Sequence, residues 1–229
     1  MTGWPDALGD VFRSRRGRWW VGGVVTVAAV CVAALWRDDG SSDARGPIER
    51  RTYVKIKRAV SGHAVKLKHS DERVYYAGIR APYPDEPLYA EAKARNAALV
   101  DGRKLRVRYD DEQRDKKGRL QVYVFDRGTF VNETLVREGL AYVRVTPNGD
   151  RFAERLLAAQ AEARRKRRGI WALKPGPPEQ EYAADAKYGN FHRPSCEEVP
   201  KIKPERLRLF KRRHAALGKG FAPCARCKP

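Results

Sequence analysis

The sequence is short of cysteine, of acidic residues and of long apolar runs, and each shortage excludes a class of protein. Four cysteines in 229 residues are too few for a disulfide-stapled scaffold. A single long apolar run excludes a polytopic membrane protein, while a hydrophobic content of 42% excludes a wholly disordered chain. The 28 acidic residues face 48 Lys and Arg, which leaves a net charge of +20. This excess predicts an anionic partner: nucleic acid, an anionic membrane surface or an acidic polymer.

The one long apolar run, residues 19–36, is expected to be a membrane anchor. It carries no charge, and as a helix it would span roughly 27 Å, close to the thickness of a hydrocarbon core. Tryptophans lie at both of its ends, where indole rings favour the membrane interface. Because residues 1–18 are basic, we expect a single-pass protein of the cell membrane with a cytoplasmic N-terminus and extracytoplasmic domains. A cleaved signal peptide is the alternative.

Composition divides the rest of the chain into two folded parts and two spacers. A polar linker over 37–48 precedes the larger part, 49–171, and a Pro-rich linker over 172–187 precedes the smaller part, 188–229. In the larger part, alternating apolar residues predict short strands at 53–57, 64–68, 105–109 and 120–125, and an apolar run predicts another at 74–79. Gly- and Pro-free stretches predict helices at 88–100, 131–138 and 150–168. Five short strands with inserted helices predict a β-rich α+β domain built on a five-stranded OB-type barrel.

The smaller part needs a stabilising cross-link, such as a disulfide or a bound metal, because so few residues can bury only a small hydrophobic core. Two close pairs supply one: His192 with Cys196, and Cys224 with Cys227. Zinc takes four N or S ligands in a tetrahedron, and each pair can chelate from one turn. With protein at all four positions, we expect a structural zinc site. A disulfide plus a free thiol is the alternative, but it leaves an odd cysteine in a compartment that we expect to be oxidising.

The residues around these ligands, 192–196 and 220–229, resemble the zinc-binding module of Ada-type alkylation-response proteins. In that module the first ligand is a cysteine that accepts the methyl group, and here His192 stands in its place. The resemblance therefore implies a Cys3His zinc site and a structural or DNA-facing role, without alkyl transfer.

Residues 52–171 resemble the staphylococcal nuclease family, an OB-fold with helices. Four motifs carry the resemblance in the correct order: 77–82, 115–119, 131–141 and 169–171. The family cleaves phosphodiester bonds with one calcium ion. Carboxylates hold the ion, two arginines clamp the phosphate, and a glutamate positions the attacking water. The resemblance thus implies a nuclease or a protein that descends from one.

Motif by motif, most of the residues needed for this chemistry are replaced. His63 and Arg80 stand where the family has calcium carboxylates, Tyr75 replaces one clamp arginine, and Tyr83 replaces the glutamate. Only Arg119, the second clamp arginine, remains. Calcium takes oxygen ligands and would be repelled by a cation, so calcium is not expected as a cofactor. His63, Arg80 and Arg119 therefore mark a degenerate catalytic centre.

Two surfaces are candidates for nucleic-acid binding. In the degenerate centre, Arg80 would supply the charge that the metal once gave, beside Arg119, and Tyr75 and Tyr83 would stack on unpaired bases at roughly 1–3 kcal/mol per base. A plain loop aromatic is an equally open interpretation of Tyr83. The second surface is the basic run that contains Lys211, Arg212 and Arg213.

Three functions remain open at this stage. The first is a membrane-anchored protein that binds DNA or RNA through a degenerate nuclease-like domain. The second is an enzyme, a nuclease with a rearranged centre in which His63 acts as general base and Asp85 and Glu86 replace the lost acids. The third is a basic surface protein that binds anionic lipid or wall polymer.

Overall fold

The computed structural model describes residues 52–110, 113–115, 117–146 and 151–229, which belong to one compact unit. The apolar run over 19–36, its flanks and the 37–48 linker lie outside the described residues. Within the described part of the chain, no helix is both long and apolar enough to cross a membrane.

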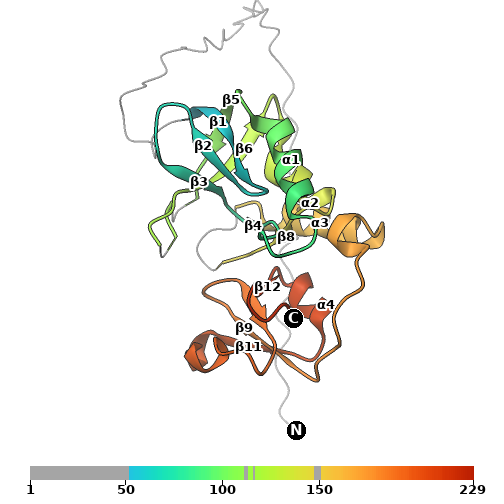
Figure 1. Ribbon diagram of the computed structural model, residues 1–229. Helices are drawn as coiled ribbons and strands as arrows, with labels where there is room; N and C mark the ends of the chain where they lie inside the picture. The colour runs from blue at the N-terminus through green and yellow to red at the C-terminus, as the bar shows by residue number, and fades with distance from the viewer. Residues whose placement is uncertain (1–51, 111–112, 116, 147–150) are drawn as a thin grey trace, which may run out of the picture. The chain divides into compact units, whose positions relative to one another are not determined.

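A closed five-stranded barrel forms the larger part of this unit, as predicted (Figure 1). Antiparallel pairing joins neighbours in the order β3-β2-β1-β5-β6, and a parallel pairing of β3 with β6 closes the barrel. Two register shifts in β1, after Ile56 and after Ala59, bend this strand so that it can pair with both β2 and β5. The strands are β1 Tyr53–Ser61, β2 Ala64–Leu67, β3 Arg73–Tyr76, β5 Lys104–Arg108 and β6 Gln121–Asp126.

Three helices cover the barrel core, close to the predicted ranges: α1 Tyr89–Val100, α2 Val131–Arg137 and α3 Ala153–Arg165. The short strand β7, Thr129–Phe130, leads into α2. Asn132 fixes α2 to the barrel, because its buried amide accepts from Val124 N–H at 3.0 Å and donates to the Ala77 carbonyl at 2.9 Å. Such side-chain bonds satisfy backbone groups that burial would otherwise leave unpaired.

Two glycines bring the end of α2 against the chain that follows α3. Gly139 has φ +73°, and a Cβ there would lie 2.1 Å from the Arg168 carbonyl oxygen. Gly169, at the start of the 3-10 turn η2 (Gly169–Trp171), has φ +50°, and a Cβ there would lie 2.3 Å from the Gly139 carbonyl oxygen. Only glycine fits either position, which explains why two of the motifs noted above each contain one.

A two-strand ladder outside the barrel positions Arg80, one of the residues of the predicted centre. Strand β4, Ile79–Arg80, pairs antiparallel with β8, Tyr142–Val143, so that Arg80 lies opposite Tyr142. Ile79 and Val143 point together into the core and are fully buried. Because side chains alternate along a strand, Arg80 and Tyr142 share the other face.

The C-terminal part is a small four-stranded sheet in the order β11-β9-β10-β12, with a core of its own (Figure 1). Its β9 lies inside the region predicted as a Pro-rich linker over 172–187, so that prediction placed the linker's end too late. The buried residues Tyr182 and Ala184 of β9 belong to the small core. The elements are β9 Tyr182–Asp185, β10 Asn190–His192, η3 Val199–Lys201, η4 Pro204–Arg206, β11 Leu207–Phe210, α4 Arg213–Gly218 and β12 Ala222–Pro223.

Direct bonds attach this C-terminal module, residues 180–229, to the barrel domain. Val145 N–H donates to the Gly220 carbonyl at 2.8 Å. Gln160, buried on α3, accepts from Val143 N–H and donates to the Leu217 carbonyl, both at 2.8 Å. A side chain at Gly189 would collide with the Val145 carbonyl, so the two backbones touch. The module and the strand β8 therefore pack as one piece of structure.

Candidate functional site

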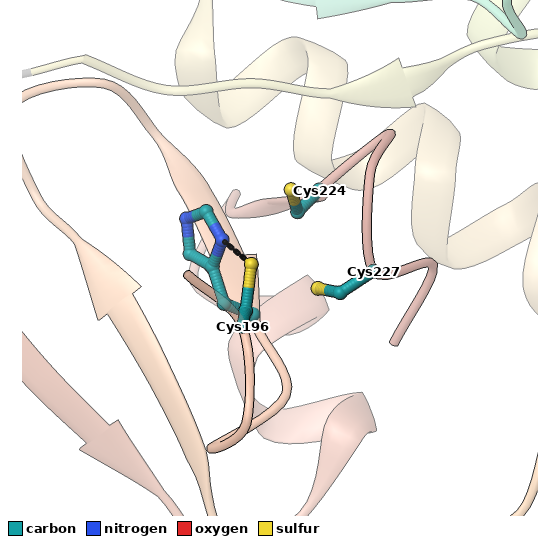
Figure 2. A group of neighbouring side chains, drawn as sticks. Cys196, Cys224 and Cys227 are labelled. Atoms are coloured by element: carbon teal, nitrogen blue, oxygen red, sulfur yellow. Dashed lines mark hydrogen bonds between the residues drawn. The ribbon is translucent and has the colours of Figure 1, made fainter. Parts of the chain in front are cut away.

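The four predicted metal ligands come together in the C-terminal module. His192 ends β10, Cys196 lies in the following turn, and Cys224 and Cys227 lie just after β12. Their ligand atoms all lie within 4.8 Å of one another, and Figure 2 shows the three cysteine sulfurs converging on one space. A tetrahedral zinc at about 2.3 Å from each sulfur places ligand sulfurs roughly 3.8 Å apart. The observed cluster fits that requirement.

Hydrogen bonding within the cluster lowers the pKa of Cys224 and raises that of Cys227, and outer bonds hold the ligands in place. The Cys227 thiol and the His192 ring form hydrogen bonds that lower the pKa of Cys224. Arg193 N–H donates to Cys227 Sγ at 3.3 Å, and Arg193 Nε donates to the Cys227 carbonyl at 3.0 Å. Metal ligands are commonly oriented by such outer bonds. The four residues would hold zinc as a structural ion, in agreement with the closed donor set.

Arg80 faces a carboxylate rather than solvent. Only 1% of the residue is exposed. Its Nη1 and Nη2 donate to the two oxygens of Glu86, each at 2.7 Å, and Nη2 also donates to the Pro223 carbonyl at 3.0 Å. The rings of Tyr83 and Tyr142 flank the guanidinium at 5.0 and 5.3 Å. The prediction that Arg80 clamps a phosphate is corrected here. Both Nη atoms of Arg80 already donate to Glu86, so the guanidinium has no free pair of donors for a second anion.

His63 is buried, and its ring Nδ1 accepts the Ala81 N–H at 3.3 Å. Burial lowers the pKa of His63 to about 3, with further lowering from Arg144, Arg80 and Arg119. The ring is therefore neutral at pH 7 and carries its proton on Nε2. A group with so low a pKa takes a proton poorly from water. The geometry gives no support to the general-base role weighed for it.

Arg119, Tyr75 and Tyr83 lie around His63. The guanidinium of Arg119 stacks 4.6 Å from the Tyr75 ring centre, and its Nε donates to Asp115 at 2.7 Å. The His63 ring lies 6.2 Å from Tyr75 and 6.1 Å from Tyr83, centre to centre. Both tyrosines and Arg119 are partly exposed. The structure thus places Arg119, Tyr75 and Tyr83 around His63, and the buried Arg80 lies against the Tyr83 ring.

The two acids considered as replacements for the calcium ligands are both engaged in ion pairs. Glu86 holds Arg80, and its Oε2 also accepts the Tyr83 N–H at 2.8 Å. Asp85 is exposed and pairs with Lys228 of the C-terminal module at 2.7 Å. Asp85 and Glu86 therefore hold their loop against Lys228 and Arg80 and do not form a set of calcium ligands.

Sequence reasoning missed Arg144, which follows β8 and is partly exposed. Its backbone N–H donates to the Gly78 carbonyl at 2.9 Å, which extends the β4–β8 ladder by one residue pair. Two residues after Tyr142, Arg144 lies on the same face of the ladder as Arg80. The alternation of Tyr142, Val143 and Arg144 was the available signal.

The second predicted surface is only partly free. Lys211 and Arg212 are exposed between β11 and α4. Arg213 Nε instead donates to the Pro229 carbonyl at 2.9 Å, and its side chain hydrogen-bonds Tyr142. Arg213 therefore joins the C-terminal module to the ladder that carries Arg80, which leaves Lys211 and Arg212 as the solvent-facing pair.

Two family models match the chain in these two regions. The model described as staphylococcal nuclease homologue matches residues 73–173, and the model described as metal binding domain of Ada matches residues 180–229. The second match begins within the predicted linker, as β9 does.

Curated relatives match the barrel domain. The thermonuclease of Staphylococcus intermedius is 30% identical over 165 residues, which cover 65% of this chain and 95% of the relative. The SPbeta prophage-derived endonuclease YokF of Bacillus subtilis is 35% identical over 130 residues, 52% of this chain and 44% of the relative. Endonuclease YncB of the same organism is 33% identical over 130 residues, covering 61% of its length.

We expect one zinc ion per chain, bound by the four clustered ligands. His192→Gln should reduce zinc content and lower the free energy of unfolding by several kcal/mol, because the ligand pairs join both ends of the module. His214→Gln removes an exposed histidine of the same module and serves as control. Zinc released on denaturation and thermal unfolding measure both effects. Equal zinc content in the two variants would contradict the assignment.

Arg80→Met should destabilise the fold strongly, because it leaves the Glu86 carboxylate, 11% exposed, without its partner. Removing one member of a buried pair costs about 3–5 kcal/mol. The double variant Arg80→Met, Glu86→Gln should recover part of this loss, since no uncompensated charge remains. Urea unfolding of the wild type, the single variant and the double variant measures these free energies of unfolding. A decrease below about 1 kcal/mol for Arg80→Met would show that the pair is dispensable.

Proposed function

The chain belongs to the staphylococcal nuclease family, and from that premise we propose that it binds nucleic acid at an altered nuclease centre without cutting it. Its relatives carry the names thermonuclease and endonuclease, which supports a nuclease or nucleic-acid-binding function. The choice between cutting and binding then depends on the residues of the centre.

The buried pair of Arg80 and Glu86 carries the argument against calcium-dependent cleavage. The guanidinium of Arg80 stands where the resemblance implies a calcium carboxylate. Both oxygens of the neighbouring Glu86 carboxylate already accept hydrogen bonds from this guanidinium. The imidazole of His63 stands at the second such position, buried and bonded to the Ala81 backbone. Calcium needs several oxygen ligands at about 2.3–2.6 Å, and neither position offers one.

Charge and aromatic surface support binding. Arg119 with the partly exposed rings of Tyr75 and Tyr83 offers a cation beside stacking surfaces, a combination typical of single-strand binding. Lys211 and Arg212 add exposed positive charge in the C-terminal module. The match of that module to the Ada metal-binding domain supports a zinc-stabilised, DNA-facing role.

A nuclease with a rearranged centre is the second candidate, because the named relatives are nucleases and Arg119 is retained. It would need a base and acids other than the buried His63 and the paired Asp85 and Glu86.

The deciding experiment incubates the purified full chain with single- and double-stranded DNA and with RNA, in calcium, magnesium or chelator. We expect salt-dependent binding and no metal-dependent digestion. A Lys211→Gln, Arg212→Gln variant should bind more weakly, with a shallower salt slope.

Digestion that depends on metal and disappears in Arg119→Gln would establish the second candidate. Anionic vesicles that displace the bound DNA at low concentration would instead favour the lipid- or polymer-binding function.

We further propose that residues 19–36 anchor the chain in the cell membrane, with the N-terminus cytoplasmic and both folded parts outside. The support is the uncharged run with tryptophans at its ends and basic residues before it.

Fractionation and protease protection test this topology. We expect the chain in the membrane fraction after an alkaline wash, with a C-terminal tag cleaved by protease added to intact cells. Deletion of residues 19–36 should remove it from the membrane. A mature chain that starts after residue 36 would show a cleaved signal peptide instead.

A further inference from the structure

The charges around the altered centre do not balance. Three guanidinium groups, Arg80, Arg119 and Arg144, act together on the pKa of His63. Glu86 neutralises Arg80, and Asp115 neutralises Arg119. Among the described residues, Arg144 has no carboxylate partner, and its Nε is buried without a hydrogen bond. The His63 ring is neutral and cannot compensate. Of the three guanidinium groups, Arg144 is therefore the one without an ion-pair partner among the described residues.

Backbone contacts on two sides fix the position of this charge. The main chain of Arg144 is bonded to Gly78 at the end of the β4–β8 ladder. Its Cγ lies 3.1 Å from the place that a Cβ of Gly189 would occupy, so its stem passes directly over the turn between β9 and β10. The C-terminal module thus confines the stem, while the residue as a whole stays partly exposed.

A partly buried cation without an ion-pair partner lowers the stability of the fold unless an anion binds to it and neutralises its charge. Burial lowers the pKa of Arg144, and the charges of Arg119 and Arg80 lower it further, while Tyr83 and Asp115 act in the opposite direction. An arginine remains protonated in proteins, so the group stays charged and under-compensated. Guanidinium donors fit phosphate oxygens closely, and charge-assisted bonds of this kind are about twice as strong as neutral ones.

We propose that Arg144 is the phosphate-binding residue of this chain, with Arg119 as the neighbouring cation and Tyr83 at the side of the site. Arg80, fixed by Glu86, supports the ladder but does not contact the ligand. The ligand is a phosphate group of a nucleic-acid backbone, so this inference rests on the proposed function. It assigns to Arg144 the phosphate contact that sequence comparison would have assigned to Arg80.

Binding of a labelled oligothymidylate to the full chain at several salt concentrations tests this residue. Arg144→Gln should weaken binding roughly tenfold at low salt and reduce the salt slope by about 0.7, the value for one phosphate on a single strand. Arg144→Lys keeps the charge and loses the planar fork, so it should keep the slope with intermediate affinity. Arg58→Gln makes the same change at an exposed position on β1 and should alter neither quantity.

Thermal unfolding with and without inorganic phosphate separates this inference from the proposed function. Phosphate should raise the Tm of the wild type and of Arg58→Gln but not that of Arg144→Gln, whose Tm without phosphate shows whether it is folded. If the wild type binds no oligonucleotide but keeps this phosphate effect, the site stands and the nucleic-acid function fails. If Arg144→Gln behaves like Arg58→Gln in both experiments, the inference is overturned, even where the wild type binds DNA.

Discussion

The buried ion pair between Arg80 and Glu86 is the interaction on which the arrangement of the residues around His63 depends. It closes the loop from Arg80 to Glu86, because the same carboxylate also receives the Tyr83 backbone N–H. It reaches the C-terminal module through the Pro223 carbonyl. A pair so poorly exposed to water is stable only when its remaining donors and acceptors are satisfied. The loop, the ladder and the module therefore constrain one another through one guanidinium.

This constraint changes what the altered centre can offer a ligand. A cation held by two carboxylate oxygens stabilises structure, whereas a cation without a partner attracts anions from solution. Of the three guanidinium groups around His63, Arg80 belongs to the first kind and Arg144 to the second. Arg80 as a structural cation and Arg144 as the proposed anion-binding residue thus have separate roles in the same small region.

Local patterns in the sequence predicted the barrel strands, the helices and the metal cluster, because alternation and ligand spacing are short-range signals. The sequence did not reveal that Arg80 would turn to Glu86, since a loop's path decides whether a nearby acid can reach it. Strand β9 was mistaken for linker because only its tertiary contacts distinguish it from a Pro-rich spacer. Arg144 was missed because its confinement comes from Gly189, which is distant along the chain.

One of the two outer strands of the described C-terminal sheet, β11, has a consequence for self-association. An outer strand presents unpaired backbone groups that a second molecule could extend into a continuous sheet. Leu209 on β11 is 55% exposed, which adds an apolar contact to that risk. Arg208, Lys211 and Arg212 surround it with charge of one sign, so two copies aligned along this edge would repel each other. The same positive side chains that favour polyanions thereby protect the strand from aggregation.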